Sequence, residues 1–245
     1  MLQKNCVVED SLVVPQLAHR ITTEFSRLPQ VVAITLAGSQ TNDADELSDF
    51  DFYIYITAEI SPKVRTEIAR KFATQIEINN QFWEPGDEWI DIASGRGVDV
   101  MYRTPNWIEQ QLERVLVNHQ ASVGYSTCLW WNASKSRPLY DRNGWFRHLQ
   151  QQASQPYPEQ LRRAIIAKNY PILGQNISAY THQIESVLNR SDFVSVHHRI
   201  TALIASYFDI VFAMNYLPHP GETWCNLLNL FANICQKTGE LICKI

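Results

Sequence analysis

The order of apolar and polar positions predicts a mixed α/β fold for the first part of the chain. Apolar runs at Val31–Ala37 and at residues 49–56, and a clean alternation over Gly97–Arg103, predict three strands. Helical spacing of apolar residues predicts helices at 11–28, 61–76, 106–117 and 142–152. Residues 82–92 are interpreted as a loop with a short strand around Trp89, and residues 128–131 and 138–140 as short strands. Such an order is typical of a small mixed sheet covered by helices.

The second part of the chain has a purely helical pattern. Two prolines among small polar residues interrupt every regular pattern at 153–158 and predict a domain boundary there. Helices are then expected at 159–170, 172–188, Phe193–Met214 and 223–237, with a loop at 215–222. The sequence therefore predicts an α/β domain at 1–152, followed by an all-α helical bundle domain at 153–245.

The composition is that of a globular protein, with 45% apolar and 19% charged residues. The five cysteines are scattered, odd in number and without a Cys-x-x-Cys pair, which argues against a zinc site or a disulfide framework and favours a reducing cytoplasm. Glu9 and Asp10 interrupt the N-terminal segment too early for a signal-peptide core, and no apolar run reaches membrane-spanning length. We therefore expect a cytoplasmic protein with no membrane partner.

The charge is distributed unevenly. Residues 1–152 contain 19 acidic and 14 basic side chains, whereas residues 153–245 contain 6 acidic and 7 basic ones. Neither part has the basic excess that a long nucleic-acid track requires. A small or protein acceptor is therefore favoured over DNA or RNA.

The segment from Gly38 to Asp51 carries the main candidate chemistry. Gly38 and Ser39 end the first apolar run in a turn whose N–H groups and hydroxyl are suited to a phosphate. Because side chains alternate along a strand, Asp49 and Asp51 project from one face while Phe50 lies on the other. Two neighbouring carboxylates repel each other unless a divalent cation lies between them. The segment therefore predicts a combined metal and phosphate site.

Two further residues are candidates for the same site. Asp99 lies between Val98 and Val100, which face the opposite side of their strand, so its carboxylate is expected in the same cleft. Lys168, in the first C-terminal helix, is a candidate phosphate-binding cation, and a plain structural role is its alternative.

This ordered set resembles the motifs of the DNA polymerase β-like nucleotidyltransferase superfamily, and within it the kanamycin- and lincosamide-type nucleotidyltransferases. The likeness covers about residues 30–142 through motifs and the helical part through architecture alone. Asn42 departs from the pattern, since related loops often carry glycine there. The resemblance implies that Gly38 and Ser39 bind the β- and γ-phosphates. It also implies that Asp49, Asp51 and Asp99 hold two Mg²⁺ ions, for which Mn²⁺ can substitute.

The function that follows from the resemblance is transfer of a nucleoside monophosphate, with AMP from ATP as the expected donor reaction, to a hydroxyl of a small acceptor. An aminoglycoside-like compound is the acceptor suggested by analogy, and a homodimer is compatible with the sequence. Two alternatives stay open. One is an antitoxin-type nucleotidyltransferase that modifies a protein partner, and the other is a nucleotide-binding regulatory module without turnover.

Overall fold

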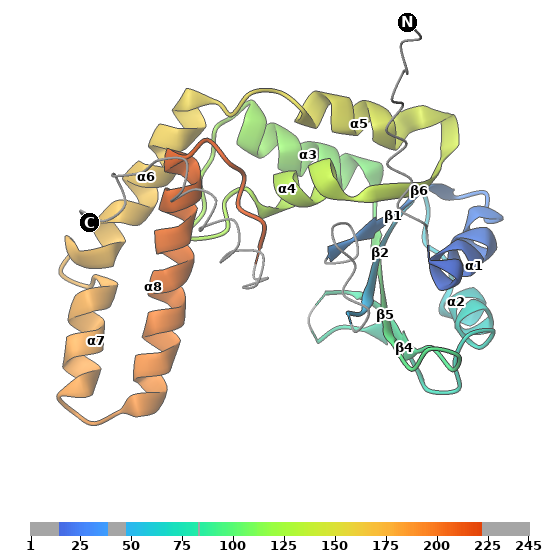
Figure 1. Cartoon of the computed structure of the whole chain (residues 1–245), viewed down its shortest axis with the longest axis horizontal. Helices are drawn as coiled ribbons and strands as arrows, with labels where there is room; N and C mark the ends of the chain where they lie inside the picture. Colours follow the sequence, from blue (N-terminus) through green and yellow to red (C-terminus); the bar gives the residue numbers. More distant parts are fainter. Residues whose placement is uncertain (1–14, 39–47, 83, 222–245) are drawn as a thin grey trace, which may run out of the picture.

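The computed structural model describes residues 15–38, 48–82 and 84–221, and it confirms the predicted fold class. A six-stranded mixed sheet with flanking helices is followed by a helical region (Figure 1). The strands are β1 (Val31–Ala37), β2 (Phe50–Ile56), β3 (Ile76–Asn80), β4 (Gly86–Ile90), β5 (Gly97–Arg103) and β6 (Arg137–Asp141). The helices are α1 (Gln16–Ser26), α2 (Pro62–Ala69), α3 (Pro105–Leu116), α4 (Cys128–Lys135), the 3-10 turn η2 (Arg142–Gly144), α5 (Trp145–Ala153), α6 (Glu159–Gly174), α7 (Tyr180–Leu188) and α8 (Phe193–Met214).

The strand order β3-β4-β5-β2-β1-β6 places the two predicted aspartate strands side by side in the middle of the sheet. β2 and β5 are parallel, and the other neighbours pair antiparallel. Residues 57–96, including α2, β3 and β4, connect the two parallel strands, as a parallel pair requires a crossover.

The alternation along β2 and β5 divides the interior into two cores. Phe50, Phe52 and Val98 lie in the core that the sheet forms with α1 and α2. Tyr53 and Tyr55 lie in the core on the other face, which is covered by α3, α4 and α5. Odd-numbered residues of β2 therefore face α3–α5, and this face is where Asp51 lies.

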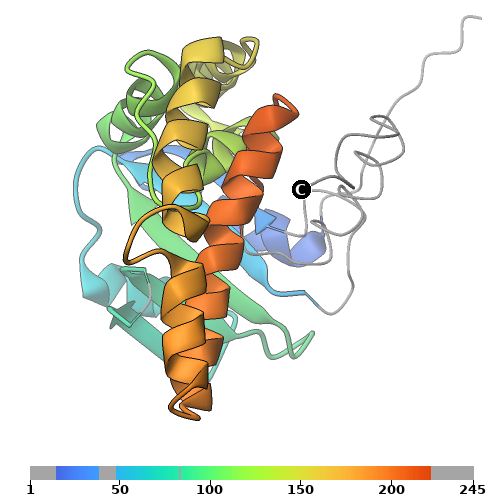
Figure 2. The same cartoon turned by 90° about the vertical axis from the view of Figure 1, so that its left-hand side faces the viewer.

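The second core continues into the helical region. Leu161 and Ile165 of α6 and Ala213 of α8 belong to the same cluster of buried side chains as the residues of α3–α5. Helices α6 and α7 follow one another in the same direction, and α8 returns alongside both (Figure 1 and Figure 2). A domain boundary after residue 152 stays a prediction, because apolar packing is continuous across that position.

A buried polar cluster joins the helical region to the loop before α4. The Asp209 carboxylate accepts hydrogen bonds from the backbone N–H and the hydroxyl of Ser126 and from the Asn169 amide. The Asn169 oxygen in turn accepts from the Gly124 N–H. Burial raises the pKa of Asp209 to about 6, although the Ser126 bonds oppose the shift. The cluster fixes α6 and α8 to the first part of the chain.

The loop after α8, which sequence reasoning placed at 215–222, is anchored at the same junction. The His219 N–H donates to the Thr127 hydroxyl at 2.7 Å, and the His219 ring packs against Phe212 and Tyr125. Burial lowers the pKa of His219 to about 4, so the ring is neutral near pH 7. These contacts give His219 a structural role.

Several predicted elements are corrected by the structure. The helix expected at 61–76 ends at Ala69, and its last residue, Ile76, instead begins β3, which pairs with β4. Residues 128–131 form the start of α4 rather than a strand, because Trp130 packs into the second core and its Nε1 donates to the Ala153 carbonyl. The helix expected at 106–117 begins one residue earlier, at Pro105, and is capped by Thr104.

Among the remaining elements, the helix expected at 11–28 is described only from Gln16, and the helix expected at 172–188 is divided into the end of α6 and α7. The helix expected at 223–237 lies outside the described residues. Within the described part of the chain, no helix combines the length and the apolar composition that crossing a bilayer requires.

Candidate active site

The two parallel central strands bring two of the predicted carboxylates together. Asp51 of β2 and Asp99 of β5 are direct register partners, so their side chains leave the same face of the sheet on neighbouring strands. Asp49 precedes β2 by one residue and is exposed. Its Oδ1 accepts a hydrogen bond from the Gly97 N–H, two residues before Asp99. All three candidate aspartates therefore lie at the end of the sheet where β2 and β5 begin.

The register extends this group into a row of carboxylates across four strands. Asp99 pairs with Glu88 of β4, and Glu88 pairs with Glu77 of β3. Asp51, Asp99, Glu88 and Glu77 thus follow one another from strand to strand on one face. Neither glutamate was predicted from the sequence, because residues 82–92 gave only a weak strand pattern and residues 77–81 were assigned to no element. The alternation of Ile76, Glu77 and Ile78 was the available signal.

Two open cavities lie along this row. One, of about 340 Å³, is lined by Asp49, Glu77, Glu88 and Asp99, together with Gln75, Trp89, Ile90 and Gly97. The other, of about 270 Å³, is lined by Asp51, Glu84, Glu88 and Asp99, together with Gly86, Asp87, Val100 and Met101. Glu88 and Asp99 contribute to both cavities, so the two spaces flank the same pair of carboxylates.

The electrostatics of the group indicate unbalanced negative charge. Burial, followed by the charges of Asp99 and Asp49, raises the pKa of Asp51 to about 7. Burial, followed by the charges of Glu88 and Asp49, raises the pKa of Asp99 to about 6. A cation placed among these groups would favour the charged carboxylates and reverse both shifts. The site as described is therefore suited to binding positive charge.

Gly38 supports the position of Asp51. Its φ of +69° lies in the left-handed region, and a Cβ atom added there would stand only 2.0 Å from Asp51 Oδ2. Only glycine permits this approach of the β1 end to the carboxylate. Ser39, the predicted phosphate-binding neighbour, lies outside the described residues.

The donor set fits a hard divalent cation, since Mg²⁺ and Mn²⁺ prefer carboxylate oxygens. Asp51 and Asp99 supply a facing pair, and Asp49 presents a third carboxylate nearby whose charge influences both. Within the described residues, however, no three His, Cys, Asp or Glu side chains are arranged to surround one ion. The carboxylates therefore lie close together without forming a complete metal-coordination site.

Two basic residues, Arg103 and the predicted phosphate-binding residue Lys168, have different positions relative to the carboxylates. Arg103, four residues after Asp99 on β5, forms an ion pair with Glu84 and lies with its guanidinium carbon 4.9 Å from the centre of the Trp107 ring. It thus stands on the carboxylate face, at the far end of the strand. Lys168 is exposed on α6, and among the described residues no hydrogen bond or ion pair joins it to the carboxylates. Its phosphate-binding role stays a prediction.

Comparisons with known proteins add little to this description. A family model described as "Domain of unknown function (DUF4037)" matches residues 129–225, which is less than half of the chain. A search of curated proteins finds no match.

Among solved structures, a nucleotidyltransferase-like protein from Exiguobacterium sibiricum 255-15 is similar at 11% identity and a TM-score of 0.38, over 82% of this chain and 57% of that one. A mutant of the toxin–antitoxin MntA-HpeT is similar at 12% identity and a TM-score of 0.33, over 66% of this chain and 96% of that one. Both scores are too low to carry an argument about activity. The functional assignment therefore depends on the residues and geometry of the site.

Proposed function

We propose that this chain is a metal-dependent nucleotidyltransferase that transfers a nucleoside monophosphate, AMP from ATP in the expected case, to a hydroxyl of a small acceptor. The observation that carries the proposal is the register pairing of Asp51 with Asp99 on parallel strands, with Asp49 beside them and Gly38 against Asp51. Three carboxylates at the start of β2 and β5, beside the glycine that follows β1, are suited to holding divalent cations next to a triphosphate.

The residues have separate roles in this proposal. Asp49, Asp51 and Asp99 would hold two Mg²⁺ ions, and Gly38 with Ser39 would bind the β- and γ-phosphates. The bound cations would neutralise charge on the triphosphate and lower the pKa of the acceptor hydroxyl. Asp99 lines both cavities, and in this proposal it would also accept the acceptor's proton.

The chemical class of the acceptor is proposed from the charge of the side chains that line the cavities. The cavities along the carboxylate row are lined by acidic side chains, which favour an acceptor carrying amines, such as an aminoglycoside-like compound. A protein acceptor, as in antitoxin-type enzymes, and a regulatory module without turnover are the competing hypotheses.

Pyrophosphate release tests the proposal directly. Each of the four nucleoside triphosphates is supplied with Mg²⁺ or Mn²⁺ and a panel of aminoglycosides and lincosamides, and the variant Asp49→Asn/Asp51→Asn serves as control. We expect acceptor-dependent release that the double variant abolishes. Transfer of label from an α-³²P-labelled triphosphate to a copurifying protein would instead favour the protein acceptor. Nucleotide binding with no release under any condition would favour the regulatory module and contradict the proposed activity.

Replacing Gly38 with alanine should weaken metal binding by about 10–100-fold, the usual effect of disturbing a ligand's support. The new methyl group would displace the Asp51 carboxylate, which lies 2.0 Å from its position. Calorimetric titration with Mn²⁺ measures the change. Gly144→Ala is the matched control, because Gly144 has a similar φ of +72° but nothing within 4 Å of its added Cβ. Equal losses in both variants would attribute the effect to backbone strain alone.

A further inference from the structure

Asp49 differs from the other two aspartates in how it is held. The paired register of β2 and β5 begins at Phe50 and Val98, so Asp49 lies just before the ladder. Asp51 and Asp99, by contrast, lie within it. Since the ladder hydrogen bonds do not fix Asp49, its position depends on other contacts.

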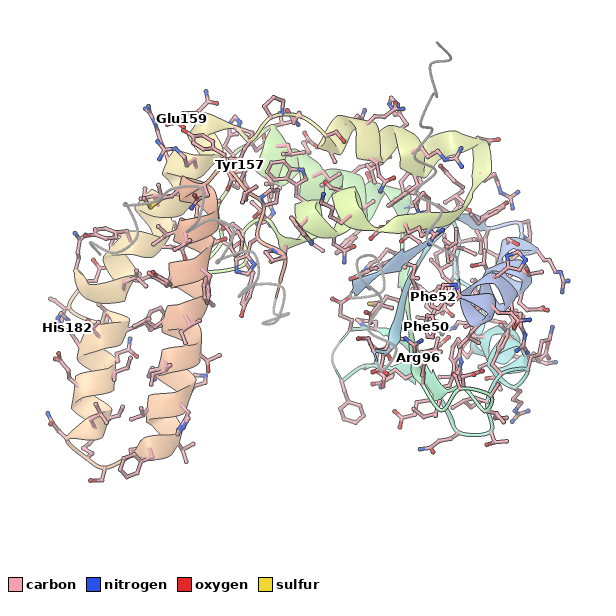
Figure 3. The ribbon with its side chains drawn as sticks, in the orientation of Figure 1. Phe50, Phe52, Arg96, Tyr157, Glu159 and His182 are labelled. Carbon is pink, nitrogen blue, oxygen red and sulfur yellow. The ribbon has the colours of Figure 1, made fainter. Side chains whose placement is uncertain are left out.

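Arg96 provides contacts on both sides of Asp49 in the chain. Its Nε donates to the Ser48 carbonyl at 2.9 Å, and its Nη2 donates to the same oxygen. Its guanidinium carbon lies 4.0 Å from the centre of the Phe50 ring, at the start of β2, and Figure 3 shows Arg96 next to Phe50. One side chain therefore holds the residue before Asp49 and the residue after it.

The turn that carries Arg96 is itself fixed. The Asp91 side chain is 2% exposed, and its Oδ2 accepts from both the N–H and the hydroxyl of Ser94. The Asp91 N–H donates to the Arg96 carbonyl at 2.9 Å. Because the turn is closed by these bonds, the Arg96 side chain starts from a defined backbone position.

Gly97 contacts the carboxylate of Asp49 itself. Its N–H donates to Asp49 Oδ1 at 3.1 Å. A Cβ atom at Gly97 would stand 2.6 Å from that oxygen and 2.7 Å from the carboxyl carbon, so the carboxylate occupies the space that a side chain would need. Arg96 and Gly97 together determine where the Asp49 carboxylate lies.

We infer that Arg96 is a positioning residue, which acts through Ser48 and Phe50 to hold the Asp49 carboxylate where it can bind a divalent cation with Asp51 and Asp99. This inference rests on the proposed function, because it assigns Arg96 to the metal site of that function. Its neighbour Gly97 supports the same carboxylate through its backbone N–H. Arg96 was not among the candidates found in the sequence, where a single arginine in a turn carries no signal.

The test is calorimetric titration of the full chain with Mn²⁺ alone, combined with thermal unfolding. Arg96→Ala removes both hydrogen bonds and the ring contact, and we expect Mn²⁺ affinity to fall by about 10–100-fold. Arg96→Lys keeps a cation near Phe50 and one donor for Ser48, so it should recover part of the affinity. Gly97→Ala removes no hydrogen-bonding side chain but displaces the carboxylate, and it should weaken Mn²⁺ binding similarly. Arg70→Ala, at the exposed residue that caps the C-terminus of α2, removes the same charge and should leave the affinity unchanged.

The outcomes separate this inference from the function on which it rests. Mn²⁺ binding that Asp49→Asn weakens but Arg96→Ala and Gly97→Ala leave unchanged would overturn the role of Arg96 and leave the proposed function standing. A wild-type protein that neither binds Mn²⁺ nor releases pyrophosphate would overturn both. If Arg96→Ala does not fold, Gly97→Ala and Arg96→Lys decide the question, and a folded Gly97→Ala with wild-type affinity counts against the inference.

Discussion

Replacing Asp51 with asparagine should abolish pyrophosphate release and, at the same time, stabilise the metal-free protein above pH 7. Loss of a residue that only supports a metal ligand lowers activity by up to about 100-fold. Loss of a ligand itself should therefore lower the rate by more than about 100-fold. The opposite effect on stability arises because burial and the charges of Asp99 and Asp49 disfavour the Asp51 carboxylate. Asparagine has a similar shape without that charge.

The pH dependence of stability follows from the direction of the shift. The pKa of Asp51 rises from its usual 3.8 to about 7 on folding, so between these values the folded chain holds a proton that the unfolded chain has released. Stability from this group is therefore present below about pH 4 and is lost as the pH rises to about 7. The change corresponds to at most about 4 kcal/mol. Thermal unfolding of the metal-free protein between pH 5 and 8 should show a larger loss of stability in the wild type than in Asp51→Asn, which keeps only the smaller losses from the raised pKa values of Asp99 and Asp209.

Two comparisons make this prediction specific. Added Mg²⁺ should stabilise the wild type at pH 8, because a ligand that binds only the folded state shifts the equilibrium toward it, and should stabilise Asp51→Asn far less. Glu67→Gln removes an exposed carboxylate from α2 and should change neither activity nor the pH profile. An Asp51→Asn variant that retains wild-type release would exclude Asp51 from the reaction.

Replacing Asp87 with alanine should destabilise the protein by about 3–5 kcal/mol, the cost of leaving one partner of a buried ion pair. Asp87 is 1% exposed, and its Oδ1 accepts from Arg65, itself 5% exposed, at 2.8 Å. The same carboxylate accepts from the Tyr102 hydroxyl at 2.7 Å and from the Asn79 N–H at 2.9 Å. Alanine would leave the buried Arg65 guanidinium without its charge partner and would remove the acceptor of the Tyr102 hydroxyl and the Asn79 N–H.

Urea unfolding followed by tryptophan fluorescence measures this cost. Glu24→Gln is the control, because the Glu24–Lys71 pair is solvent-accessible and should contribute less than about 1 kcal/mol. The double variant Arg65→Met/Asp87→Leu should lose less than Asp87→Ala, since no buried charge remains unpaired. A free energy of unfolding for Asp87→Ala within about 1 kcal/mol of the wild type would mean that water reaches Arg65 after the substitution.

Local sequence patterns predicted the bounds of a helix or strand correctly where packing against distant residues was not needed to decide its secondary structure. The strands Val31–Ala37 and Gly97–Arg103 and the long helix Phe193–Met214 have the predicted bounds, because each has strong apolar periodicity and flanking breakers. The prediction failed at residues 128–131, whose aromatic residues favour a strand. There, packing of Trp130 into the second core and its bond to Ala153 outweigh local propensity.

The sequence by itself determined that Asp49 and Asp51 would project from one side of their strand, and Asp99 from the side opposite to Val98 and Val100, because side-chain alternation is a property of any extended chain. Only the tertiary structure decided which strands are neighbours, and with them the pairing of Asp99 with Glu88 and of Glu88 with Glu77. Strand register is set by non-local hydrogen bonds and packing, which no local pattern contains. The same holds for Arg96, since its contacts with Ser48 and Phe50 join residues nearly fifty positions apart in the sequence.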